Sequence, residues 1–138
     1  MIRVPLWAPC LSILSLRLKL GGKEWHYGYV VSLLNDLCGI QARGGCSCAG
    51  PYGQALLGMD MNYSRAIQYQ IDAGNVILRP GWVRLNFNYF ISESECDYLL
   101  DAIELVAKHG WRMLKYDGCD IESGVWRVKN GARSVAVG

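Results

Sequence analysis

The 138-residue sequence lacks an excess of charge of either sign, because 14 basic and 12 acidic residues leave a formal net charge of +2. Its lysines and arginines are scattered along the chain and form no basic run. A nucleic-acid-binding domain normally concentrates positive charge on one face or along one helix. The sequence therefore argues against nucleic acid as a partner.

A long hydrophobic run is also absent. The mostly apolar stretch that ends at Leu16 is interrupted by Pro5 and Pro9, and it is too short to cross a bilayer. No small-residue cleavage site of the secretory type follows it. We therefore expect no membrane partner, and we predict that residues 1–10 form an irregular N-terminal segment.

The six cysteines (10, 38, 46, 48, 96 and 119) show no regular spacing. An even number leaves a disulfide framework arithmetically possible, but Cys38 and Cys96 lie inside helical patterns. We favour reduced thiols and a cytoplasmic location. Cys46-x-Cys48 allows the hypothesis of a zinc or redox module, although the pair lacks a second matching pair or a nearby histidine. We expect no metal ligands.

The hydrophobic periodicity predicts one domain that mixes strands and helices. Strands are expected at 14–20, 40–43, 81–91 and 111–116, and helices at 28–38, 52–58, 64–73 and 92–110. Gly39 and Gly110 are natural helix stops, and Ser92 with Glu95 is a capping box. This order favours an α+β fold, a small mostly antiparallel sheet with helices packed on one face.

The chain is organised around residues 41–53, which combine Arg43, Cys46, Cys48 and Pro51 with four glycines. Glycines allow a sharp turn or the close approach of a ligand. Functional groups are frequently held on such short connections between packed elements.

The segment Arg43-Gly44-Gly45-Cys46-Ser47-Cys48-Ala49-Gly50-Pro51 resembles the Arg-x-Gly-x-x-Cys-Ala-x-Pro motif of class V aminotransferase-fold enzymes. These pyridoxal-phosphate (PLP) enzymes include cysteine desulfurases and selenocysteine lyases. The strand Gly81-Trp82-Val83-Arg84-Leu85-Asn86-Phe87-Asn88-Tyr89-Phe90 is similar to the family strand whose arginine binds the substrate. The resemblance covers residues 11–116, as the C-terminal small domain, and leaves 117–138 as a loop-rich tail.

The resemblance implies roles for three residues. Arg84 would bind the carboxylate of an amino-acid substrate such as cysteine through a bidentate pair. Cys48 would be the catalytic nucleophile and would act as a thiolate. Arg43 would lie at the edge of the substrate site. The two histidines that precede the cysteine in the desulfurase branch are replaced here by Cys46 and Ser47.

The family's Schiff-base lysine and phosphate-binding residues lie in a large domain upstream of the small one. None of the five lysines, at 19, 23, 108, 115 and 129, has a similar context. We therefore expect no cofactor-binding residue in this chain, and we interpret the chain as a C-terminal fragment that is inactive alone. Its expected partner is a large PLP-binding domain or a second subunit, covering an apolar patch at Trp82, Tyr89 and Phe90. The alternative is a non-catalytic interaction module or remnant.

Overall fold

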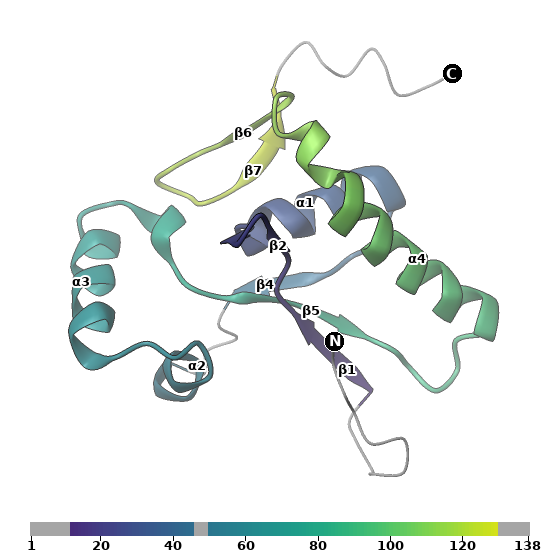
Figure 1. Ribbon diagram of the computed structural model, residues 1–138, viewed down its shortest axis with the longest axis horizontal. Coiled ribbons are helices and arrows are strands. Elements are labelled where there is room, and N and C mark those ends of the chain that lie inside the picture. The colour runs from purple at the N-terminus through teal and green to yellow at the C-terminus, as the bar shows by residue number, and fades with distance from the viewer. Residues whose placement is uncertain (1–11, 46–49, 130–138) are drawn as a thin grey trace.

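The computed structural model describes residues 12–45 and 50–129, and it has an α+β fold (Figure 1). The four α-helices of this part are α1 (Tyr27–Cys38), α2 (Gly50–Leu56), α3 (Met61–Asp72) and α4 (Glu93–His109). Two 3-10 helices are η1 (Val76–Leu78) and η2 (Gly110–Met113). The strands are β1 (Ile13–Leu16), β2 (Lys19–Leu20), β3 (Lys23–Glu24), β4 (Arg43–Gly45), β5 (Trp82–Asn86), β6 (Asp117–Cys119) and β7 (Trp126–Val128).

Strand β5 is the centre of a three-stranded antiparallel sheet with the order β1-β5-β4. Leu14 pairs with Leu85, and Ser15 pairs with Arg84. The other strands form two separate hairpins, β2-β3 and β6-β7. The predicted small antiparallel sheet is thus confirmed within the described residues.

Helices α1 and α4 cover one face of this sheet. The buried hydrophobic residues come from β1, α1, β5, α4 and the segment after α1: Leu16, Tyr29, Val30, Leu33, Leu34, Ile40, Val83, Leu85, Ala102 and Val106. Because side chains alternate along a strand, Val83 and Leu85 face these helices and the residues between them face away. The second face of the sheet, which we call the open face, carries Trp82, Arg84 and Asn86.

The ends of α1 and α4 follow the local sequence signals. Gly39 adopts the left-handed conformation (φ 64°) and its N–H donates to carbonyls of the last turn of α1. Ser92 accepts from the backbone N–H of Glu95, and the Glu95 carboxylate accepts from the N–H of Ser92 at 2.7 Å. Both predicted boundaries are confirmed, because each depends on residues adjacent in sequence.

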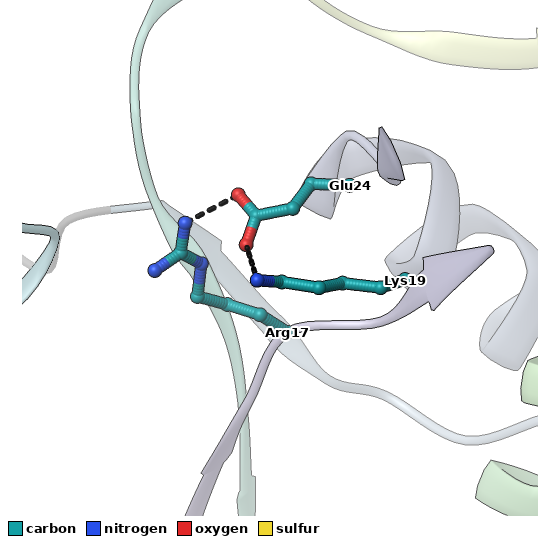
Figure 2. Close-up of polar contacts among 3 residues, drawn as sticks. All are labelled: Arg17, Lys19 and Glu24. Carbon is teal, nitrogen blue, oxygen red and sulfur yellow. Dashed lines mark hydrogen bonds and ion pairs between the residues drawn. The ribbon is translucent and has the colours of Figure 1, made fainter. Parts of the chain in front are cut away.

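The strands are shorter than their alternation predicts. The strand expected at 14–20 is divided into β1 and β2, and β2 pairs with β3, where Glu24 forms ion pairs with Arg17 and Lys19 (Figure 2). Strand β5 ends at Asn86, although Phe87 N–H still donates to the carbonyl of Ser12, and no strand of the described residues pairs with residues 88–91. Tyr89, which lies beyond the end of the strand, is 97% exposed.

Two other predicted strands are displaced. The expected strand at 40–43 is found at Arg43–Gly45, while Ile40 packs into the core outside any strand. The expected strand at 111–116 is wrong, because η2 and a turn occupy this stretch. The segment after Asp117, expected to be loop, instead forms the β6-β7 hairpin. Its Trp126 ring packs against Tyr29 with ring centroids 4.9 Å apart.

Helices α2 and α3, expected at 52–58 and 64–73, begin a few residues earlier than predicted. Figure 1 shows them together to one side of the sheet, away from α4. We call this unit the α2-α3 arm. Ser64 is the single buried residue of α3, so the arm contributes little to the core.

Candidate functional site

The open face places two arginines side by side. Arg43 of β4 is the direct register partner of Arg84 of β5, and Ser15 of β1 is the partner of Arg84 on its other side. Directly paired residues of an antiparallel sheet project their side chains from the same face. Ser15, Arg84 and Arg43 therefore form one row across the sheet, which we call the arginine row.

The arginine row is short of negative charge. The carboxylates of the ion pairs found in the described residues belong to Glu24 and Glu104, and neither pairs with Arg43 or Arg84. Like charges directly opposite in a sheet repel each other. Arg84 is half-buried and Arg43 is exposed, so an anion that binds between them would remove this repulsion.

The arginine row suits a planar anion. A guanidinium group presents paired N–H donors that match both oxygens of a carboxylate or a phosphate. Arg84 lies on the central strand β5, which pairs with β1 on one side and with β4 on the other. Asn86 and the half-buried Trp82 flank it on the same face. The row can therefore hold a carboxylate, with an amide and an aromatic ring beside it.

Glycines bring the strands of this site close together. A Cβ on Gly81, just before β5, would lie 2.5 Å from the Cα of Gly45, and one on Gly44 would lie 2.6 Å from the Tyr27 ring. Gly45 also has a positive φ of 116°, which favours glycine. The glycines of the predicted central stretch thus serve the packing of β4 against β5 and α1.

The structure brings together two of the three predicted site residues. Arg43 and Arg84 are far apart in sequence but paired in the sheet. The predicted nucleophile, Cys48, and its neighbour Cys46 lie outside the described residues. The remaining predicted patch is divided: Trp82 is half-buried, while Tyr89 and Phe90 are 97% and 71% exposed, with their rings in an edge-to-face contact at 5.3 Å.

His26 is an important residue that the sequence interpretation missed. Its Nδ1 accepts hydrogen bonds from Gly28 N–H (3.1 Å) and Trp126 Nε1–H (3.0 Å). Its Nε2 lies 2.9 Å from the carbonyl oxygen of Ile77 and donates to it. Burial lowers the pKa of His26, and the hydrogen bond to Ile77 opposes this shift. The neutral imidazole therefore joins α1, η1 and β7 at one point.

Asp117 is a second important residue that the sequence interpretation did not identify. It is buried, and its Oδ2 has no hydrogen-bond partner in the described structure. Burial raises the pKa of Asp117, and Asp36 raises it further while Lys129 lowers it. Burial, assisted by Asp117, raises the pKa of Tyr29 to about 12, and the Tyr29 hydroxyl donates to the carbonyl of Gly110 at 2.7 Å. Trp126 and Asp117 lie in the segment that was expected to be loop. A large aromatic residue there is the sequence signal that could have indicated a packed hairpin.

The described residues offer little for the zinc hypothesis. No group of three or more histidine, cysteine, aspartate or glutamate residues there has the geometry of a metal site. Cys38, Cys96 and Cys119 carry free thiols. Burial raises the pKa of Cys38, which disfavours a reactive thiolate at that position.

None of the helices in residues 12–45 and 50–129 has both the length and the apolar character that a membrane span needs. The chain matches no family model, no curated protein and no solved structure.

Proposed function

We propose that this chain is the small, substrate-binding domain of a PLP-dependent enzyme of the class V aminotransferase type, acting on an amino acid. One observation carries the proposal: Arg84 and Arg43, assigned to substrate binding from two separate motifs, are direct partners on the open face. Arg84 binds the substrate carboxylate, and Arg43 lies at the edge of the same site.

The chain's own lysines do not fit the cofactor. All five are exposed, and none lies on β1, β4 or β5. Lys19 pairs with Glu24 and Lys108 with Glu104. A Schiff-base lysine must reach the cofactor beside the bound substrate. We therefore assign this lysine to a separate large domain or subunit, and the chain by itself to substrate binding without turnover.

Cys48 keeps its proposed role as the nucleophile of a desulfurase-type reaction. It follows β4 in sequence, three residues after Gly45. The nearby charge of Arg43 would favour its thiolate form.

The carboxylate site can be tested on the chain as it is. L-Alanine and L-alaninamide differ in that the amide has no carboxylate, so they form a matched ligand pair. We expect L-alanine to shift the Arg84 side-chain NMR signals with an affinity in the millimolar range, equivalent to about −4 kcal/mol. L-Alaninamide should leave them unchanged.

The variants sharpen this experiment. Arg84→Gln should weaken L-alanine binding at least tenfold, and Arg84→Lys should weaken it less. Arg112→Gln is the control, because Arg112 lies over the ring of Trp111, outside the sheet. Equal binding of alanine and alaninamide, or an unchanged affinity of Arg84→Gln, would contradict the carboxylate site.

The assignment of the cofactor lysine needs its own experiment. We expect borohydride reduction of the chain with stoichiometric PLP to label no single lysine specifically, as read by mass spectrometry. Specific labelling of one lysine would overturn this part of the proposal and would identify a self-sufficient enzyme.

A non-catalytic association module is the second candidate, and the exposed aromatic pair Tyr89 and Phe90 favours it. Exposed aromatic residues are enriched at protein interfaces. The double variant Tyr89→Ser, Phe90→Ser distinguishes the two functions. It should leave alanine binding intact if the arginine row is a substrate site. It should abolish association if the Tyr89-Phe90 pair is an interface.

A further inference from the structure

A groove of about 710 Å³ lies on the side of α1 that faces the β6-β7 hairpin. Its lining comes from three elements: one side of α1 from its first to its last turn, Gly44 of β4, and residues 124–128, which include β7. Strands β4 and β7 belong to different sheets, and each is an edge strand. The groove is therefore bordered by two sheet edges that no strand of the described structure covers.

The register of the β6-β7 hairpin shows which backbone groups of β7 face away from β6. Lys129 N–H donates to the carbonyl of Tyr116, and Asp120 N–H donates to the carbonyl of Val125. Hydrogen bonding alternates along an antiparallel pair, so the odd-numbered residues of this stretch bond to β6. Trp126 and Val128 direct their N–H and C=O groups to the opposite edge, where the Ser32 hydroxyl of α1 approaches the Trp126 carbonyl at 3.5 Å.

The same reasoning applies to β4. Phe87 N–H donates to the carbonyl of Ser12, so the odd-numbered residues of β5 bond to β1 and the even-numbered ones bond to β4. Arg43 and Gly45 are the register partners of even-numbered residues. Gly44 therefore directs its N–H and C=O away from the sheet, at the border of the groove.

The charge of β7 limits what can pair with this edge. Arg127 is exposed, lines the groove and has no described carboxylate within ion-pair distance, although its charge helps to lower the pKa of Asp120. A second copy of the chain that paired all three residues of β7 with the same strand would place Arg127 opposite Arg127, which is unfavourable. A carboxylate at that position would instead make a favourable cross-strand pair.

From these free edges and this charge we infer that the groove binds an extended polypeptide segment with an acidic residue, which adds as a strand to the Trp126–Val128 edge of β7. Main-chain hydrogen bonds supply the affinity in this mode of recognition, and side chains supply the specificity. The acidic residue lies opposite Arg127. Its neighbours lie on the side of Trp126, which packs against Tyr29 of α1, so they are apolar.

The floor of the groove limits the number of acidic residues. Asp36 lines the groove on α1 and accepts hydrogen bonds from Ser32 and Asn35. A second carboxylate near Asp36 would be repelled. The segment therefore has the pattern apolar-acidic-apolar and not a run of acidic residues.

The probe is the blocked peptide acetyl-Thr-Val-Glu-Val-Thr-amide, titrated into the full chain and followed by the backbone amide signals in NMR. We expect saturable shifts, and slowed hydrogen exchange at Val128 N–H, which the peptide should cover. The version with lysine in place of glutamate should bind at least fivefold more weakly. Arg127→Gln should remove most of this difference, and Arg112→Gln, on an exposed side chain outside the groove, should preserve it.

Methylated peptides distinguish strand addition from a charge contact alone. One isomer carries N-methyl groups on the odd-numbered peptide residues, and the other carries them on the even-numbered residues. Because one edge of the peptide faces β7, one isomer should lose binding and the other should keep it. Equal binding of both isomers, or loss of both, would overturn strand addition, as would the absence of any saturable shift at Val128 and Trp126.

Two outcomes would assign the groove to another occupant and so overturn the proposal. Protection of Val128 N–H that rises with protein concentration without peptide would indicate a second copy of the chain. Protection that is complete at all dilutions, and is lost when residues 130–138 are deleted, would indicate that the chain's own C-terminal segment fills the groove.

Discussion

Helices α1 and α3 have the same length, twelve residues each, but they depend on different interactions. Four residues of α1 are buried in the core, whereas Ser64 is the single buried residue of α3. Most helical stability in proteins comes from the packing of an apolar face. The comparison shows that α1 depends on tertiary packing, whereas α3 depends mainly on its local N-cap and on its contact with the neighbouring η1.

The largest expected effect comes from truncating a side chain that α1 buries in the core. Leu34 is fully buried, and we expect Leu34→Ala to lower the free energy of unfolding by about 2–5 kcal/mol. Tyr69→Ala on α3 is the control, because Tyr69 is 73% exposed, and a change within about 0.5 kcal/mol is expected. Urea unfolding of both variants measures the difference. Similar losses would show that α3 is packed as tightly as α1.

The contact between α1 and the sheet can be tested by adding a methyl group. A Cβ on Gly44 would lie 2.6 Å from the Tyr27 ring of α1. We expect Gly44→Ala to cost about 1–3 kcal/mol, the usual effect of overpacking. Gly118→Ala is the matched strand control, because its Cβ would meet Lys129 at an ordinary 3.4 Å. Equal unfolding midpoints for the two variants would show that Tyr27 moves aside freely.

A smaller effect is expected at the N-cap of α3. The Asp60 side chain accepts a hydrogen bond from Tyr63 N–H at 2.7 Å, so Asp60→Ala should cost the helix about 1 kcal/mol. If the arm is locally stabilised, hydrogen exchange will accelerate in α3 while the amides of α1 and α4 stay protected. A matching acceleration in α1 would show that the arm and the core unfold together.

The pH dependence of stability tests how firmly the N-terminus of α1 is held, without any substitution in the core. Because the folded-state pKa of His26 is lowered, the unfolded chain binds the proton more readily than the folded one. Stability from His26 is therefore complete above its ordinary pKa of 6.5 and is lost as the pH falls from there through the folded-state pKa.

We expect amides at the start of α1 and in β7 to exchange faster, relative to α3, as the pH falls in this range, after correction for intrinsic rates. His26→Gln should remove the pH response, and the exposed His109→Gln should leave it unchanged. A response that survives in His26→Gln would assign the titration to another group. Asp117 responds in the opposite direction, because its folded-state pKa is raised from 3.8 and its contribution to stability is lost as the pH rises.

Local signals in the sequence predicted the helix ends well. Gly39 ends α1, and Ser92 with Glu95 begins α4, because these features require nothing beyond their own neighbours. The sequence failed where a strand's length depends on its partners. Residues 88–91 alternate like a strand, but no strand of the described part of the chain pairs with them. Trp126 was assigned to a loop because the partners that bury it, His26 and Tyr29, are far away in the chain.

The candidate site was likewise predicted in part by the sequence and decided in part by the tertiary structure. The resemblance of two sequence motifs to class V enzymes suggests Arg43 and Arg84 as substrate-binding residues. Their pairing across β4 and β5 was decided only by the sheet register. The sequence by itself determined the α+β character, the ends of the two core helices and the balanced charge. The tertiary structure decided which strands pair, which edges remain free and which charges face each other, because these depend on contacts between residues distant in the chain.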